Sequence, residues 1–233
     1  MNGFNKLVYS FLDRYDFSII YEKFHVFIPA AIETLKITAA SILFGLVLGL
    51  VVALMKLSKN VLLNIPAKMY IGLIRGTPLL LQLLIIFYGL TDIVKLPPFT
   101  SAVLAFGVHN AAYIAEVFRG SILSVDQGQR EAARSLGMTK TQAFKRVIFP
   151  QAFKRAVPPL GNQFIIATKD SSLAAYISIN ELLLKSEQLG SSTYHPLEYY
   201  MLAGIYYLII TLTLGYIVHR IERRLAVSDR GGQ

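Results

Sequence analysis

Two stretches of the sequence are uncharged for about the length of a membrane span. Ile37–Met55 and Tyr199–Val218 contain no charged residue, and a helix needs about 20 predominantly apolar residues to cross the hydrocarbon core of a bilayer. Charged residues make up 16% of the whole chain, against about 25% in soluble domains. The sequence therefore predicts an integral membrane protein built of helices.

Three further spans are expected between these two. The first of them is interrupted near its start by Gly76-Thr77-Pro78, because Pro78 lacks a backbone N–H and frees carbonyl groups near Ile74. Freed carbonyl groups are tolerated in a membrane only beside protein or a water-filled cavity. The membrane domain is expected over residues 26–222, between an amphipathic segment 1–25 and a tail 223–233, with spans at about 30–55, 69–90, 99–122, 157–179 and 199–218.

The 23 Lys and Arg residues are distributed unequally between the two sides that five spans define. Most of them lie in the loop after the first span, in the segment 126–155 and in the C-terminal tail. Because positively charged loops remain in the cytoplasm, we expect the N-terminus outside and the C-terminus inside. Topology thus accounts for the net charge of +9, and no nucleic-acid partner is expected.

The charged segment 126–150 carries the signals of two short helices joined by a turn. Two residues are placed to cap the helix N-termini, each with a glutamine three residues on as its capping-box partner. These pairs are Asp126 with Gln129 and Thr139 with Gln142. Gly137 fits a left-handed C-terminal cap, and Pro150 is expected to end the second helix. A solvated charged loop is the alternative interpretation.

Several spans carry polar side chains that a lipid-facing helix would not tolerate. Glu116 is ionisable within an apolar segment, at a cost of about 2.5–3.5 kcal/mol at the bilayer centre on insertion scales, which predicts either a cavity or an ion pair with Arg119. Lys169 and Asp170 divide the fourth span, where they either line a pathway or bond to neighbouring helices. Further polar residues lie near the break, at Thr77 and Gln82, and in the fourth span, at Asn162, Gln163, Thr168, Ser171 and Ser172.

The order of short motifs resembles that of one family. Glu131-Ala132-Ala133, then Gly137 and Ile148-Phe149-Pro150, is similar to the EAA loop of ABC-importer permeases, although the final motif is one residue short. Four further motifs resemble the polar amino-acid branch of these permeases, and the resemblance covers about residues 25 to 220. They are Arg75-Gly76-Thr77-Pro78-Leu79, Ala112-Tyr113-Ile114-Ala115-Glu116, Phe118-Arg119-Gly120 and Lys169-Asp170-Ser171-Ser172-Leu173.

This resemblance implies the type I ABC importer permease fold: an all-α membrane protein of five transmembrane helices with a cytoplasmic coupling-helix hairpin. It implies a bacterial inner-membrane subunit that imports a polar amino acid and is not itself an enzyme. No cofactor is expected in this chain, since a partner ABC ATPase would bind ATP and Mg²⁺. The other expected partners are an extracytoplasmic amino-acid-binding protein, membrane lipid, and a second copy or a paralogous permease as the other half of a dimer.

The resemblance and the polar pattern together give two sets of candidate residues. The expected ATPase-coupling residues are Glu131, Ala132, Ala133, Ser135 and Gly137. The expected substrate-pathway residues are Thr77, Gln82, Glu116, Lys169, Asp170, Ser171 and Ser172.

Absent motifs narrow the alternatives. The chain has no Cys and no Gly-x-x-x-x-Gly-Lys-Ser/Thr phosphate loop, so ATP hydrolysis would have to take place on another chain. Two alternatives stay open. One is a permease of the same class for methionine or a quaternary amine, and the other is a channel or ion-coupled secondary transporter that uses Glu116 and Asp170.

Overall fold

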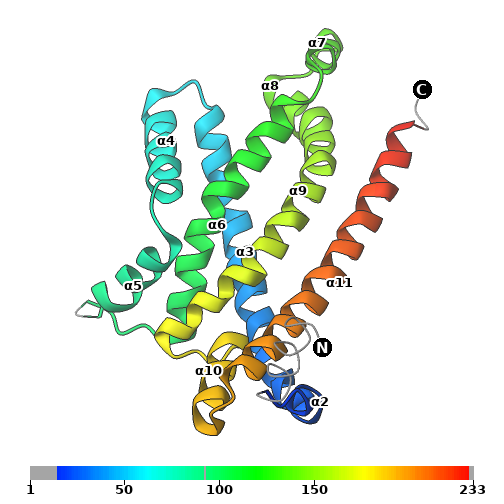
Figure 1. Cartoon of the computed structure of the whole chain (residues 1–233). Helices are drawn as coiled ribbons and strands as arrows, with labels where there is room; N and C mark the ends of the chain where they lie inside the picture. Colours follow the sequence, from blue (N-terminus) through cyan, green and yellow to red (C-terminus); the bar gives the residue numbers. More distant parts are fainter. Residues whose placement is uncertain (1–14, 92, 231–233) are drawn as a thin grey trace, which may run out of the picture.

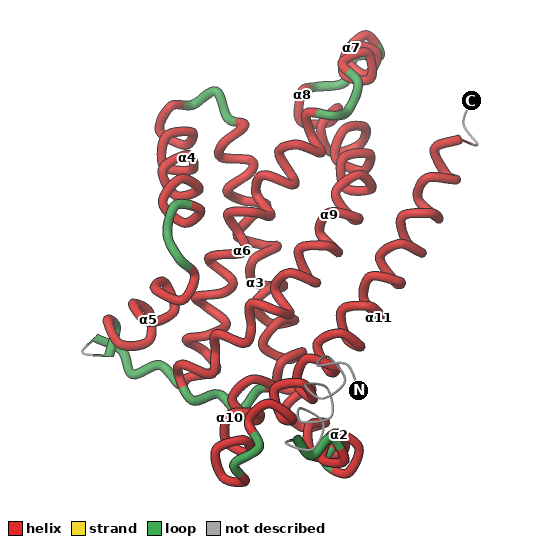
Figure 2. The backbone as a smooth tube through the Cα atoms, in the orientation of Figure 1, coloured by secondary structure: helices red, strands yellow, loops and turns green. Residues whose placement is uncertain are grey.

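The computed structural model describes residues 15–91 and 93–230, the last five as backbone only, and this part of the chain is helical without any strand (Figure 2). The expected amphipathic segment 1–25 therefore falls largely outside the described residues. The helices are α2 (Ser18–Glu22), α3 (Ile28–Leu57), α4 (Val61–Arg75), α5 (Leu79–Gly89), α6 (Pro98–Leu123), α7 (Gln127–Ser135), α8 (Lys140–Ala143), α9 (Phe149–Asp170), α10 (Leu182–Thr193) and α11 (Pro196–Arg230). Two 3₁₀ segments, Phe24–Phe27 and Ser171–Ile177, and a π-helical turn, Phe144–Ile148, join or extend them.

Three of the described helical segments are long and apolar enough to cross a membrane. They are Phe24–Leu57, Pro98–Leu123 and Pro196–Leu225, and α4 with α5 meets the same criterion as a pair bent by 103°. α9 does not meet it, because polar residues such as Asn162, Gln163 and Lys169 interrupt its apolar sequence. The fifth span therefore stays a prediction.

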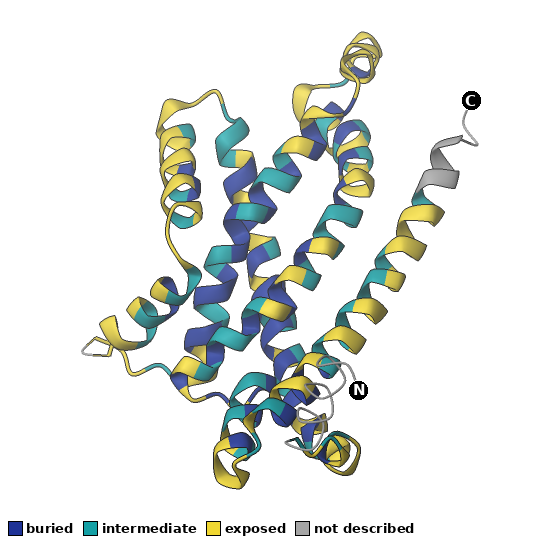
Figure 3. Ribbon diagram, viewed as in Figure 1, coloured by how far each residue is buried: buried dark blue, intermediate teal, exposed yellow. Residues whose placement is uncertain are grey.

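Close contact between α3 and α6 forms the centre of the bundle, where the buried residues concentrate (Figure 3). Gly49 on α3 leaves no room for a side chain, since a Cβ atom there would lie 2.7 Å from Ile114 Cγ2 and 2.9 Å from the Ala111 carbonyl oxygen. A Cβ at Gly45 would lie 3.2 Å from the Gly107 carbonyl. The two glycines, one turn apart, let the two backbones approach as small-xxx-small pairs do in membranes.

Three expected helix boundaries are wrong. The helix before the break begins at Val61 and not near residue 69. Pro150 does not end the helical pattern, and the fourth long helix does not begin near residue 157, because α9 begins at Phe149 and continues through Pro158 and Pro159. Pro150 lies in the first turn of α9, where backbone N–H groups have no acceptor within the helix, so a residue without an N–H is tolerated there.

The elements separate into two ends along the bundle (Figure 1). The α7–α8 hairpin and the C-terminal end of α11 lie together at one end, with the α3–α4 loop. The N-terminal end of the described chain, α2 and α10 lie at the other. α11 leans away from the bundle toward its C-terminal end, and its membrane-spanning window is mostly exposed. We refer below to the end with the hairpin as the hairpin end.

Candidate functional site: a broken span and a projecting hairpin

A polar cluster forms where the chain breaks between α4 and α5. The Gln82 side chain is 9% exposed, and its Nε2 group donates to the Ile74 carbonyl at 2.9 Å. The same group donates to the Thr77 carbonyl at 3.2 Å and lies 2.8 Å from the Thr77 hydroxyl oxygen. Ile74 lies four residues before Pro78, so its carbonyl is the one that the proline leaves without a backbone donor. The side chain of Gln82 replaces that donor and contacts Thr77. The sequence placed both residues near the break and did not predict this contact.

Side chains of α6 and the end of α4 extend this cluster. The His109 Nδ1 atom lies 3.1 Å from Gln82 Oε1, and the His109 ring centroid lies 5.1 Å from that of Tyr113. The Arg75 guanidinium lies over the Tyr113 ring, 5.1 Å from its centroid, in cation–π geometry. The cluster thus combines a cation and several hydrogen-bond donors with acceptor oxygens, which are the groups that a zwitterion requires. Of these, Arg75 and Tyr113 were not among the residues that the sequence singled out for the pathway, although both lie in the motifs that carry the resemblance.

Glu116 lies in a separate ionic cluster. Its two carboxylate oxygens lie 2.5 Å from Lys56 Nζ and 3.0 Å from Arg119 Nε, and its side chain is 20% exposed. The ion pair with Arg119 is thus present. Lys56 was missed, because it is separated from Glu116 by 60 positions in the sequence. The side chain of Asn64 donates to the Lys56 carbonyl, so the cluster links α3, α4 and α6. Among the described residues no hydrogen bond connects Glu116 to Gln82 or Thr77.

The polar residues of the fourth long helix, α9, do not form a single cluster. Lys169 is exposed and Asp170 half-buried where α9 changes into a 3₁₀ helix. Ser171 is fully buried and donates to the Thr168 carbonyl at 2.7 Å, whereas Ser172 is half-buried. One turn and a half before Lys169, the Gln163 amide donates to Asn110 Oδ1 on α6 at 2.7 Å, with both residues buried. This bond holds α9 against α6 in the middle of the bundle.

The hairpin has most of the caps that the sequence predicted. Asp126 accepts from the Gly128 N–H at 2.7 Å, and Thr139 and Gln142 form a reciprocal capping box. Gly137 has φ +79°, a left-handed conformation, and the Met138 N–H donates to the Ala133 carbonyl across it. Gln129 is not a capping-box partner, since its Oε1 accepts from Gln151 Nε2 at 3.3 Å.

The expected coupling residues lie along α7 and its C-terminal turn. Glu131, Ala132, Ser135 and Gly137 are exposed, and Glu131 accepts from Gln127 Nε2 at 2.9 Å. Ala133 is 3% exposed, unlike the other four. A cavity of about 500 Å³ beside α7 is lined by Glu131 and by Arg130 and Arg134. The hairpin therefore projects from the bundle as an ordered, mostly exposed element (Figure 1).

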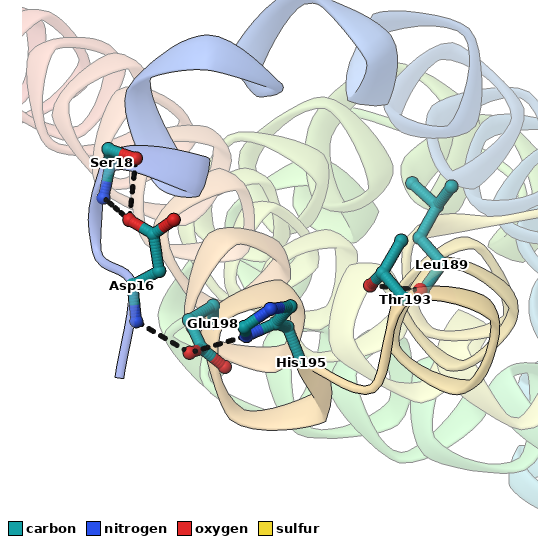
Figure 4. A network of polar contacts seen from close by, with 6 residues as sticks. All are labelled: Asp16, Ser18, Leu189, Thr193, His195 and Glu198. Carbon is teal, nitrogen blue, oxygen red and sulfur yellow. Dashed lines mark hydrogen bonds and ion pairs between the residues drawn. The ribbon is translucent and has the colours of Figure 1, made fainter. Parts of the chain in front are cut away.

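The opposite end of the bundle is held by carboxylates. Glu198 is 1% exposed, and its Oε1 atom accepts from the Asp16 backbone N–H at 3.0 Å and lies 3.2 Å from His195 Nδ1 (Figure 4). Hydrogen bonds from the Ser18 hydroxyl and backbone N–H lower the pKa of Asp16. Glu181 caps α10 by accepting from two backbone N–H groups and from Tyr207, and burial raises its pKa. These contacts fasten α2 and α10 onto α11.

The chain is similar to known proteins along nearly its whole length. Residues 45–227 match the family described as binding-protein-dependent transport system inner membrane component. The glutamine transport system permease protein GlnP of Escherichia coli K12 is 36% identical over 217 residues, which are 92% of this chain and 99% of GlnP. The L-cystine transport system permease protein TcyB of Bacillus subtilis is 45% identical over 194 residues, 82% of this chain and 83% of TcyB. The crystal structure of an amino acid ABC transporter with histidines has a TM-score of 0.84 and 41% identity, and the match covers 90% of this chain and 98% of that one.

Proposed function

The chain belongs to the family of binding-protein-dependent transport system inner membrane components, and from this we propose that it is the translocation subunit of an ATP-driven importer for a polar amino acid. Its relatives GlnP and TcyB are named for the transport of glutamine and L-cystine. The observation that supports the assignment most directly is the capped hairpin of residues 126–148, which carries the Glu131-Ala132-Ala133 motif and projects from one end of the bundle.

In this proposal the hairpin connects the bundle to a separate ATPase subunit. That subunit binds ATP and Mg²⁺, and this chain holds no cofactor. Glu131, Ala132, Ser135 and Gly137 contact the ATPase, and Ala133 keeps α7 packed on the rest of the hairpin. The motion of the ATPase on binding ATP then moves the bundle between inward-open and outward-open states, which makes the bundle a two-state element that the nucleotide and an external amino-acid-binding protein both bias.

The orientation and assembly follow from the same proposal. The hairpin end faces the cytoplasm of a bacterial cell, and the end with α2 and α10 faces the external binding protein. The charge supports this orientation, since Lys56, Lys59 and the basic residues of the hairpin lie together at one end. Two such subunits, identical or paralogous, enclose the pathway.

The substrate meets the polar cluster at the break. An amino acid presents a carboxylate and an ammonium group, so its site requires donors and acceptors together. Arg75 is the cation for the carboxylate, and the oxygens of Thr77 and Gln82 accept from the ammonium group. Lys169, Asp170, Ser171 and Ser172 line the path beyond it. Glu116 acts as a brace between α3 and α6 while it is paired with Lys56 and Arg119.

The role of Arg75 can be tested in uptake measurements. Arg75→Gln should raise the KM for the amino acid by about tenfold or more, because a charge-assisted hydrogen bond to a carboxylate contributes about 1.5–3 kcal/mol. Arg75→Lys should recover part of the affinity, since it keeps the charge and loses the planar contact with Tyr113. Unchanged KM in both variants would remove Arg75 from the site.

The function itself can be tested by reconstitution in liposomes with the cognate ATPase and binding protein. We expect amino-acid uptake that requires ATP, and loss of ATPase co-purification in Gly137→Asp. Gly137→Asn is the matched control, because asparagine and aspartate both tolerate the left-handed conformation and only aspartate adds a negative charge to the turn, so association should largely survive. Uptake by the chain alone on a proton gradient, without ATP, would instead support the ion-coupled transporter.

A further inference from the structure

A second cavity lies where the α3–α4 loop meets the hairpin. It has a volume of about 380 Å³, and its charged lining consists of four basic residues from three segments of the chain. They are Lys59 from the loop, Arg130 and Arg134 from α7, and Lys140 from α8. The rest of its lining is apolar: Ala143, Phe144 and Ile148. No acidic residue lines this cavity.

The four cations that line this cavity are not held in ion pairs within the part of the chain that the structure describes. Two guanidinium groups are held in position by backbone carbonyls, Arg130 Nη2 by Ile122 at 3.3 Å and Arg134 Nη1 by Met138 at 2.6 Å. A guanidinium has five N–H donors, so each of these two keeps donors for a ligand. Like charges gathered around one hollow repel one another, and an anion in the hollow removes that repulsion.

We propose that this cavity binds the phosphate headgroup of an anionic phospholipid from the leaflet at the hairpin end. Lys59 follows directly after the span that ends at Leu57, which places it at the boundary of the bilayer. The next helix begins with apolar side chains that face outward, Val61 at 61% and Leu62 at 81% exposure. Lys59 thus connects the cavity to the start of an exposed apolar helix. A phospholipid has a charged half and an apolar half that match these two features, whereas a soluble anion would use the cations alone. Basic pockets on the cytoplasmic side of transmembrane helices bind anionic headgroups.

The inference depends on the hairpin end lying at a membrane surface and not on which solute is carried. It can therefore fail while the proposed transport function stands, and the reverse. The lipid site is tested by measuring lipid binding to the purified chain, and this measurement involves neither ATP nor amino acid.

Native mass spectrometry of the purified full chain, with phosphatidylglycerol or phosphatidylcholine added, gives the direct test. We expect retention of phosphatidylglycerol over phosphatidylcholine. Lys59→Gln with Lys140→Gln should weaken that binding by about 30-fold, at roughly fivefold for each basic residue near an anionic surface. Lys145→Gln with Arg146→Gln is the matched control, because it removes the same charge from exposed positions of the same hairpin that do not line the cavity.

Three results would overturn the proposal. One is equal loss of phosphatidylglycerol in both double variants, which would mean that only the overall charge matters. Another is equal retention of the two lipids by the unmodified chain. The third is complete release of phosphatidylglycerol by excess inorganic phosphate, which would identify the cavity as a site for soluble anions.

Discussion

Proline lies within the helical part of the chain at several places, Pro66 inside α4 among them, and two of these places have opposite outcomes. At Pro78 the chain breaks and turns by 103° between α4 and α5. At Pro158 and Pro159 the helix α9 continues without a break to Asp170. A proline in a helix interior costs about 3 kcal/mol in either case, so the residue type alone does not decide between a break and a continuous helix.

The surroundings of the two sites account for the difference. α9 is held on both sides of its prolines: Ala156 is fully buried in the core, and Gly161 packs so closely on Val218 that a Cβ atom would lie 2.5 Å from its Cγ2. The residues of the break, 75–78, are exposed. There the backbone groups are bonded by the side chain of Gln82 instead of by a continued helix. Packing keeps one helix whole, and a side-chain donor stabilises the interruption of the other.

Gly76→Ala should have the largest effect on the break. A Cβ at residue 76 would lie 2.8 Å from the Gly72 carbonyl oxygen, and overpacking of this kind costs about 1–3 kcal/mol. We expect a lower midpoint of thermal unfolding and at least about tenfold slower uptake at a site that requires its groups within about an ångström. Gly72→Ala on the same helix is the control, since a Cβ there meets nothing within 4 Å. Similar losses in both variants would show that the break does not depend on the space at Gly76.

Gln82→Leu should have an intermediate effect. It removes the donor to the carbonyls of Ile74 and Thr77, and an unsatisfied buried acceptor costs about 1–3 kcal/mol. We place the loss of stability near the lower limit, because Thr77 is exposed and water can bond its carbonyl. The midpoint of thermal unfolding and the rate of uptake should both decrease. Leu81→Ala is the control, because it changes an exposed neighbour of Gln82 and should leave uptake nearly unchanged. Full activity in Gln82→Leu would contradict the idea that this side chain stabilises the break.

Pro158→Ala with Pro159→Ala should have the smallest effect. The substitutions restore two backbone N–H groups within a helix that already continues, so thermal stability should be unchanged or higher, and uptake should change by less than about twofold. A loss of uptake comparable to that of Gly76→Ala would mean that α9 also bends during transport, and the contrast between the two proline sites would no longer hold.

The sequence predicted local features more accurately than helix boundaries. The Thr139–Gln142 capping box, the left-handed Gly137 and the break at Gly76-Thr77-Pro78 depend on residues within a few positions of one another, and all three are present. The predicted start of the fourth long helix near residue 157 was wrong, since α9 begins at Phe149. The packing that carries the helix through Pro158 and Pro159 involves residues far away in the sequence.

The candidate site was predictable to a similar extent. Thr77 and Gln82 were both expected near the break, and their side chains lie 2.8 Å apart there. Glu116 was grouped with them because it is also polar within an apolar span. The structure instead pairs it with Lys56, which no spacing rule could indicate across 60 positions.

The sequence by itself determined that the chain is a helical membrane protein, where its polar interruptions fall and which hairpin projects from it. The cost of placing backbone or charge in lipid allows few alternatives along a single segment. Only the tertiary structure decided which polar groups meet. Helix partners, the pairing of Glu116 with Lys56, and the basic cavity between Lys59 and the hairpin depend on how the helices pack, and that packing arises from contacts between segments that are distant in the sequence.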